Sequence, residues 1–237
     1  GISNTVNTDN EGPEVRIYFN DENFVFGGLT DENPLLIVKL EDENGINTVG
    51  TGIGHDVTAK LDEELDNEDI ESEGERNFIL NNYYNSVLDD FTKGSIEYPL
   101  ADLEPGLHTI RVKAWDVFNN SGEGYTEFLV AESADLALQN VLNYPNPFTD
   151  KTNFWFEHNR AGDLLNVRIQ VFTLSGRVVK TIQQDIAGAK SRVTELEWNG
   201  MDEFGNKIGK GVYIYQISVT DSNNETVEEI QRLVLLK

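Results

Sequence analysis

Short stretches in which apolar and polar residues alternate dominate this chain. In residues 107–115, for example, Ile110 and Val112 share one face, whereas Arg111 and Lys113 lie on the opposite face. This alternation indicates strands that turn one face toward a core. Similar stretches, rich in β-branched and aromatic residues and bounded by Gly, Asn, Asp and Pro, predict further strands in the first half at residues 15–19, 35–40, 56–61 and 125–130.

The second half shows the same pattern after residue 143, and little in either half favours helix. Asn44-Gly45 predicts a hairpin turn over residues 42–45, because hairpin turns need positive φ angles. Short helical turns are expected only at residues 61–69 or 85–91. Strands in the second half are predicted at residues 153–157, 166–173, 177–183, 192–197, 211–220 and 228–236. Many short strands with frequent turns predict an all-β fold of two tandem immunoglobulin-like β-sandwiches.

Charge divides the chain at the same place as the strand pattern. Residues 1–135 hold 30 acidic and 7 basic side chains, a net charge of −23, whereas residues 136–237 hold 12 acidic and 11 basic, a net charge of −1. Such a contrast favours two different modules over one domain. We therefore expect an acidic sandwich over residues 1–132, a linker over 133–143 and a second sandwich over 144–237.

Composition excludes several classes of function. With 0 cysteines, the chain holds no disulfide, no thiolate zinc site and no cysteine nucleophile. The strongly negative charge argues against a nucleic-acid partner. No apolar run approaches the length of a transmembrane helix. No signal peptide is recognisable in the sequence, and from its start at Gly1-Ile2-Ser3-Asn4 we expect it to begin inside a longer protein.

The second half carries a series of motifs in a fixed order: Tyr144-Pro145-Asn146-Pro147-Phe148, Thr173-Leu174-Ser175-Gly176-Arg177, Trp198-Asn199-Gly200, Asp202-Glu203-Phe204-Gly205-Asn206, Gly211-Val212-Tyr213-Ile214-Tyr215-Gln216 and Leu233-Val234-Leu235-Leu236-Lys237. From about Leu142 to Lys237 this order resembles the FlgD-like immunoglobulin module at the C-terminus of type IX secretion cargo. That resemblance implies a secretion signal and a location at the cell surface, on the extracellular face of the outer membrane of a Gram-negative bacterium.

The first half resembles a second family, through four motifs in residues 13–130: Gly12-Pro13-Glu14-Val15-Arg16-Ile17-Tyr18, Gly52-Ile53-Gly54-His55-Asp56-Val57, Leu103-Glu104-Pro105-Gly106-Leu107-His108-Thr109 and Lys113-Ala114-Trp115-Asp116-Val117-Phe118-Asn119-Asn120. They are similar to the immunoglobulin-like region of PorU-type sortases, which are gingipain-type cysteine peptidases of the type IX system. This resemblance implies that the catalytic cysteine and histidine lie upstream of Gly1. We expect no catalytic activity in the chain itself.

The resemblance also implies a partner, a PorV-like outer-membrane barrel of the type IX secretion system. The chain would bind it through strand edges and loops of the second sandwich. The candidate partner-binding residues lie in the first, the fifth and the last motif of the second half: Tyr144, Pro145, Asn146, Pro147, Phe148, Gly211, Tyr213, Arg232, Leu233, Val234, Leu235, Leu236 and Lys237.

Other candidate sites have simpler structural explanations. His55, His108 and His158 have no metal-ligand spacing, so no metal or other cofactor is expected. The acidic run 62–75 lacks the EF-hand order of ligands, and we interpret it as a solvated loop, with calcium binding as the alternative. Residues 50–54 are glycine-rich, but a strand and not a helix follows, which argues against phosphate binding.

The three tryptophans support an alternative function. Trp115, Trp155 and Trp198 could form a sugar-binding platform in a carbohydrate-binding or adhesin-like module of a secreted surface protein. Trp155 lies within Phe154-Trp155-Phe156 and Trp198 precedes a turn. These positions favour core and sandwich-end roles over sugar binding.

Overall fold

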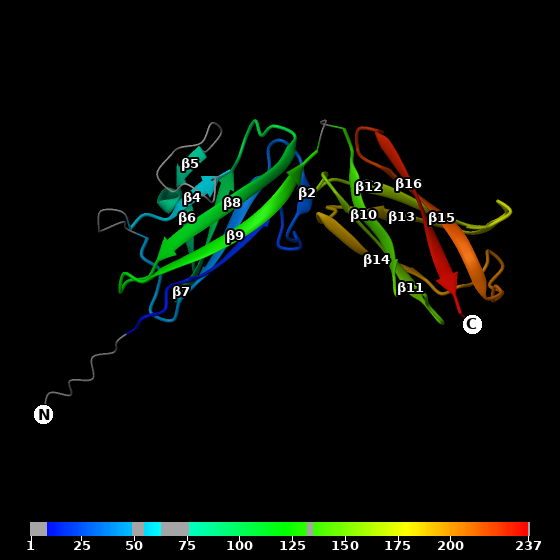
Figure 1. The fold of residues 1–237 in the computed structure, drawn as a ribbon, viewed down its shortest axis with the longest axis horizontal. Helices are drawn as coiled ribbons and strands as arrows, with labels where there is room; N and C mark the ends of the chain where they lie inside the picture. The colour runs from blue at the N-terminus through cyan, green and yellow to red at the C-terminus, as the bar shows by residue number, and fades with distance from the viewer. Residues whose placement is uncertain (1–8, 49–54, 63–75, 132–134, 237) are drawn as a thin grey trace, which may run out of the picture. The chain divides into compact units, whose positions relative to one another are not determined.

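The computed structural model describes residues 9–48, 55–62, 76–131 and 135–236, which form an all-β fold (Figure 1). No helix in this part of the chain is long and apolar enough to cross a membrane. The chain divides into two compact units, Gly1–Glu22, Asn33–Leu103 and Leu107–Phe128 in the first, and Asn23–Glu32, Glu104–Gly106 and Leu129–Lys237 in the second. The predicted class, all-β with two immunoglobulin-like sandwiches, is confirmed.

The first sandwich consists of two sheets with the strand orders β1-β3-β7-β6 and β2-β9-β8-β4-β5. Its elements are β1 (Glu14–Phe19), β2 (Gly28–Thr30), β3 (Leu35–Glu41), β4 (Thr58–Leu61), β5 (Arg76–Ile79), the short 3-10 helix η1 (Asn81–Tyr83), β6 (Tyr84–Val87), β7 (Asp90–Pro99), β8 (Gly106–Trp115) and β9 (Ser121–Val130). Alternate residues such as Leu36 and Val38 of β3 and Ile110 and Val112 of β8 are buried between the sheets, as the period of two predicts.

The second sandwich consists of a three-stranded sheet, β10-β11-β14, and a four-stranded sheet, β13-β12-β15-β16. Its strands are β10 (Leu138–Tyr144), β11 (Thr152–His158), β12 (Leu165–Thr173), β13 (Val178–Ile186), β14 (Arg192–Trp198), β15 (Gly211–Thr220) and β16 (Thr226–Leu235). Their inward residues form one apolar core, in which the rings of Phe154 and Tyr215 meet edge to face at 4.8 Å.

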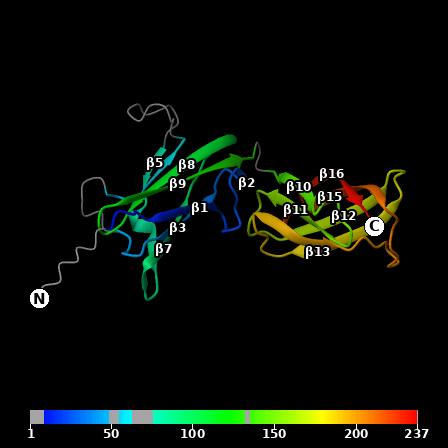
Figure 2. The ribbon, with the colours of Figure 1, turned by 60° about the horizontal axis from the view of Figure 1, so that its bottom comes forward.

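The helical turn predicted at residues 85–91 is wrong. These residues form the hairpin of β6 and β7, whose tip extends beyond the rest of the sheet (Figure 2). Asp89 has a φ of +61°, which a short polar side chain tolerates and which is incompatible with a continuing right-handed helix. The alternative at residues 61–69 falls mostly outside the described residues.

The turn predicted at residues 42–45 forms, but it does not join the two strands of a hairpin. Gly45 has a φ of +101°, and Asp42 Oδ1 accepts hydrogen bonds from the backbone N–H groups of Asn44 and Gly45. The chain then crosses to the other sheet, where Ile46 makes a β-bridge with Asp116. Turn residues therefore predicted the bend correctly but not the strands that it connects.

A strand also occupies much of the segment in which a linker was expected. β10 pairs with β11, with Leu142 opposite Trp155 and a register shift between Gln139 and Leu142. This irregularity, together with a φ of +52° at Asn140, breaks the alternation that would have marked the strand in the sequence.

Candidate functional site

Strand pairing brings the motifs of the second half to one end of the second sandwich. The register pairs at this end are Tyr144 with Asn153, Thr152 with Trp198, Thr173 with Tyr213, and Gly211 with Leu235. Residues 145–151, 174–177, 199–210 and 233–236 therefore lie together, and we call this region the motif end. Segments up to 88 residues apart in the sequence meet here, and the end of β16 lies beside the start of β15 (Figure 1).

The proline loop after β10 is bound to the last strand. Asn146 Nδ2 donates to the carbonyl oxygen of Arg232 at 3.0 Å, and Asn146 Oδ1 accepts from the N–H of Val234 at 3.0 Å. Phe148 continues this pattern, because its N–H donates to Val234 O and its carbonyl accepts from Leu236 N–H. The loop thus acts as a short extra strand and covers the outer edge of β16 near its end.

Buried polar residues that the sequence analysis did not select hold this loop. Thr152 Oγ1 donates to the carbonyl of Pro145 at 2.9 Å, and Asn143 Nδ2 donates to Thr152 Oγ1 at 3.0 Å. Asn146 Nδ2 also donates to Asn143 Oδ1 at 3.1 Å. The Tyr144-Pro145 and Asn146-Pro147 peptide bonds are both cis. A polar residue within a strand, at Asn143 or Thr152, is the sequence signal that could have identified this network.

The predicted partner-binding residues separate into two groups. Phe148, Leu233 and Leu235 are buried in the core, with exposed fractions of 3% or less, so they support the fold. Tyr144 and Leu236 are large apolar side chains that are more than half exposed. Residues with exposed side chains that remain available to a partner are therefore Tyr144, Pro145, Asn146, Pro147, Arg232 and Leu236. Lys237 lies outside the described residues.

Tyr213 holds a neighbouring loop, and Gly211 lies close to it in the sequence. The hydroxyl group of Tyr213 donates to the carbonyl of Gly209 at 2.6 Å, which fixes the chain just before β15 begins. Gly211 lies opposite Leu235 in the ladder. Both residues therefore lie at the motif end, and the hydrogen bond gives Tyr213 a structural role there.

Two exposed apolar side chains were missed by the sequence analysis, although their motifs were recognised. Leu174 is 69% exposed and Phe204 is 89% exposed, each at the tip of a tight turn. The first turn is closed by the hydrogen bond from Thr173 N–H to Arg177 O, and the second by Asp202, whose Oδ1 accepts from the N–H groups of Phe204 and Asn206. Rigid turns thus present apolar side chains to solvent, which is typical of contact surfaces.

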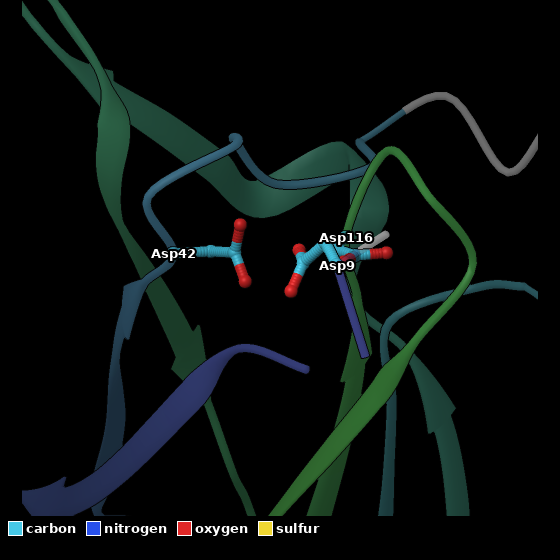
Figure 3. A group of neighbouring side chains, drawn as sticks. All are labelled: Asp9, Asp42 and Asp116. Carbon is cyan, nitrogen blue, oxygen red and sulfur yellow. The ribbon is translucent and has the colours of Figure 1, made fainter. Parts of the chain in front are cut away.

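The first sandwich contains a group of three carboxylates (Figure 3). Oxygen atoms of Asp9, Asp42 and Asp116 lie within 4.8 Å of one another, and Asp42 and Asp116 are buried. Burial raises the pKa of Asp42, and the negative charges of Asp116 and Asp9 raise it further, against the lowering effect of the N–H groups of Asn44 and Gly45. Carboxylate oxygens are ligands that Ca²⁺ accepts, although a calcium site needs six to eight oxygens.

Calcium binding by the acidic run remains a prediction, because residues 63–75 lie outside the described residues. Asp62, the first residue of that run, accepts a hydrogen bond from the N–H of Thr109 and lies 2.7 Å from His108 Nδ1. His108 is thus paired within the sandwich. His158 is fully buried, and its Nδ1 accepts from the N–H of Arg160.

The tryptophans do not form a common platform. Trp198 is buried and its indole N–H donates to Met201 O, in agreement with the predicted position at the sandwich end. Trp155 points away from the core, contrary to the core role expected from its neighbours, because Phe154 and Phe156 occupy the inward positions of the alternation. Arg192 lies 5.1 Å from the Trp155 ring centre, and Lys113 lies 5.0 Å from that of Trp115. Cations of the chain itself therefore contact both rings.

Comparison with known proteins assigns most of the second sandwich to a family. Residues 143–233 match the family described as "Secretion system C-terminal sorting domain". No curated protein sequence matches the chain. The second sandwich is therefore a type IX secretion C-terminal sorting domain and not a catalytic domain. A protein with such a tail is a secreted or cell-surface protein.

Solved structures extend the comparison to the whole chain. Dimeric latent PorU from Porphyromonas gingivalis is 29% identical over 100% of this chain, with a TM-score of 0.49, and this chain spans only 21% of its length. Fibronectin(III)-like modules of Clostridium thermocellum CbhA are 9% identical, with 94% of each chain covered and a TM-score of 0.32. The C-terminal domain of the Streptococcus pyogenes protein AspA is 12% identical, with 97% of this chain and 100% of that chain covered and a TM-score of 0.32.

Proposed function

We propose that this chain is the non-catalytic C-terminal region of a PorU-type cell-surface protein, and that its motif end docks on a PorV-like outer-membrane barrel. The observation that carries the proposal is the convergence of the sorting-domain motifs at one end of the second sandwich. Core packing does not require two tight turns at the same end of the sandwich to carry exposed apolar tips, Leu174 and Phe204. A common binding partner would explain it.

The docking surface consists of the exposed apolar side chains of the motif end. Leu174, Phe204, Tyr144 and Leu236 are all more than half exposed. Because short turns already fix Leu174 and Phe204, little conformational entropy is lost when a partner covers them. The buried residues Asn143, Thr152 and Phe148 hold the proline loop in place and would act only indirectly.

The acidic sandwich would then act as a spacer between the docking module and the rest of the protein. Its net charge of −23 over residues 1–135 disfavours contact with anionic surfaces and so leaves docking to the nearly neutral second half. The division into an acidic sandwich (1–132), a linker (133–143) and a docking module (144–237) is part of this proposal. β10, which covers most of the linker range, belongs structurally with the docking module. By the same resemblance, sortase catalysis would belong to a domain outside this chain.

The carbohydrate-binding alternative has less support. A sugar-binding platform needs exposed aromatic faces, whereas Trp198 is buried and Arg192 and Lys113 contact the other two indole rings. At the motif end, by contrast, Tyr144, Leu174, Phe204 and Leu236 are apolar side chains that are more than half exposed and that no cation of the chain is found to contact among the described residues. Docking to a protein partner fits this distribution better.

Surface display tests the proposal. A reporter with a secretory signal is fused ahead of residues 1–237 and expressed in a cell with type IX secretion. We expect the double variant Leu174→Ser and Phe204→Ser to lower surface display about tenfold or more, since central apolar contacts carry most of the binding energy. Display equal to that of the wild type would contradict the proposal.

Leu164→Ser and Ile230→Ser together form the matched control. Both residues are also more than half exposed, but Leu164 precedes β12 and Ile230 lies in the middle of β16, away from the motif end. The control also replaces two exposed apolar side chains with serine and should leave display unchanged. A loss of display in the control as large as in the test variant would show that general surface hydrophobicity, and not the motif end, matters.

A further inference from the structure

One side of the second sandwich is open. β14 is the outer strand of the three-stranded sheet, and β13 is the outer strand of the four-stranded sheet. A hollow of about 580 Å³ lies between them, lined on the β13 side by residues 180–183 and on the other by the end of β14 and the loop after it. The outer edge of β13 is therefore accessible beside this hollow.

Glu203 shows that the edge of β13 can accept an additional strand. The N–H of Glu203 donates to Val179 O at 3.1 Å, and the Glu203 carboxylate accepts from the N–H of Thr181. Glu203 thus forms the two hydrogen bonds that a residue of a neighbouring strand would form with β13. The N–H of Thr181 and the ammonium group of Lys180 hold the pKa of Glu203 below its ordinary value, so the carboxylate is charged and accepts these bonds at neutral pH.

The backbone groups that follow Thr181 face the same way. The pairing of β13 with β12 is regular from Lys180 to Ile186. Because successive residues of an antiparallel strand alternate their N–H and C=O groups between the two sides, Gln183 and Asp185 direct theirs outward as Thr181 does. Among the described residues, no backbone partner is found for these outward groups.

The other outer strand of this sheet, β16, is protected by contrast. Asn146 and Phe148 cover its final part, and Glu228 and Glu229 follow along the remaining edge. Charged residues on an edge strand oppose pairing with another chain. On β13, the open stretch after Thr181 reads Ile-Gln-Gln-Asp, with a single charge at Asp185. β13 is thus the less protected of the two edges.

The charges around the hollow indicate which side chains an added strand would carry. The charged residues that line it are Lys180, Glu197, Asp202 and Glu203, one basic and three acidic. Lys180 is already paired with Glu203 at 3.2 Å, and Lys151 is paired with Glu197 at 2.7 Å. With Lys151 counted, three acidic residues still face two basic ones, and no ion pair of Asp202 is found among the described residues, which favours a segment with lysine or arginine side chains.

We propose that the outer edge of β13 from Thr181 to Asp185 is a strand-addition site for an extended, basic peptide segment of a partner protein. Backbone hydrogen bonds to Gln183 and Asp185 would give affinity, and the carboxylates beside the hollow would select for basic side chains. The site lies on the side of the sandwich and not at the motif end. It therefore goes beyond the proposed function and does not depend on it.

A synthetic probe tests this site. The probe is a blocked, fluorescent hexapeptide that alternates lysine and valine, titrated against the full chain by fluorescence anisotropy. We expect saturable binding, and protection of the Gln183 and Asp185 amides from hydrogen exchange. Gln183→Pro, which removes an outward N–H that takes no part in the ladder with β12, should weaken binding about tenfold or more.

Ile230→Pro is the matched control, because it makes the same change on an outward-facing position of β16. It should leave binding within about twofold of the wild type. A second comparison needs no protein variant: the same peptide with alternate backbone nitrogens methylated, and a peptide with glutamate in place of lysine, should both fail to bind. No binding of the lysine peptide to the wild type, or equal binding to Gln183→Pro or of the methylated peptide, would overturn the proposal.

Discussion

The two sandwiches share an architecture but differ in the surroundings of their buried carboxylates. In the first, Asp42 and Asp116 lie close to each other and to Asp9, and no Lys or Arg side chain pairs with them among the described residues. In the second, the buried Asp221 is paired with Arg160 at 3.2 Å. The same fold therefore tolerates both arrangements, and the fold alone does not define the function of either half.

The two sandwiches also differ in what their buried polar groups do. In the second sandwich, buried polar groups such as Asn143 and Thr152 have partners and hold the proline loop of the motif end. In the first sandwich, the buried carboxylates of Asp42 and Asp116 are the ones that lack a basic partner among the described residues. The exposed acidic side chains of this sandwich favour contact with solvent. Four predictions test this contrast between the two sandwiches.

The largest expected effect distinguishes a residue that stabilises the motif end from one that would contact a partner. Phe148→Ala should destabilise the second sandwich by about 3–5 kcal/mol, because the ring is 2% exposed and packs against Trp198. Phe204→Ala should change its stability by less than about 0.5 kcal/mol, because the ring is in solvent. Hydrogen exchange of peptides from β12 and β15, with β3 and β8 as the internal reference, measures both. Equal effects of the two variants would contradict this division.

A smaller loss is expected from the buried ion pair. Arg160→Gln should cost the second sandwich about 3 kcal/mol near neutral pH, because it leaves the charge of Asp221 buried without its cation. Lys151→Gln, which removes an exposed pair with Glu197, should cost less than about 1 kcal/mol. Chemical denaturation followed by hydrogen exchange compares the two. A cost for Lys151→Gln as large as that for Arg160→Gln would contradict the role of burial.

The pH dependence of this pair follows from the pKa of Asp221. Burial alone would raise that pKa, but the N–H of Glu225, Arg160 and the N–H of Asn223 together lower it. A lowered carboxyl pKa contributes stability above the ordinary value of about 4, and this contribution is lost as the pH falls through the folded-state pKa. The difference between wild type and Arg160→Gln should therefore shrink at low pH.

The first sandwich should respond in the opposite direction. Asp42→Asn keeps the Oδ1 acceptor for the N–H groups of Asn44 and Gly45 but removes a charge whose pKa is raised. We expect a gain of about 1 kcal/mol or less near neutral pH, measured in the presence of a chelator. Because the pKa of Asp42 is raised in the folded state, ionisation of this carboxyl group costs stability at pH values above the ordinary pKa of about 4. The gain from Asp42→Asn should therefore vanish as the pH falls toward 4. A destabilised variant at pH 7 would contradict the electrostatic account.

Much of this fold could be predicted from the sequence, because period-two alternation marks strands such as β8, β12 and β15. β7 was missed, since its apolar residues are separated by Lys93, Gly94 and Glu97. β10 was taken for a linker, since a register shift interrupts its pattern. Connections between sheets, as at residues 42–46, depend on tertiary packing that turn residues do not encode.

The candidate site was predicted at the level of motifs but not of side-chain roles. The apolar run from Leu233 to Leu236 correctly predicted a strand that contributes to the core. That Asn146 would pair with the backbone of that strand could not be foreseen, because the two segments lie 86 residues apart. Exposure, which distinguishes Phe204 from Phe148, is a property of the folded state and has no local sequence signal.

The central claim is that partner recognition takes place at the motif end, and cross-linking tests it most directly. Because the chain has 0 cysteines, Phe204→Cys and Leu164→Cys each give a single attachment point for a short photo-cross-linker. Each labelled full chain is mixed with a purified PorV-like barrel and irradiated. The account predicts a cross-linked product from position 204 and none from position 164, with cross-links to the barrel identified by mass spectrometry. A product from position 164 but not from position 204 would contradict it.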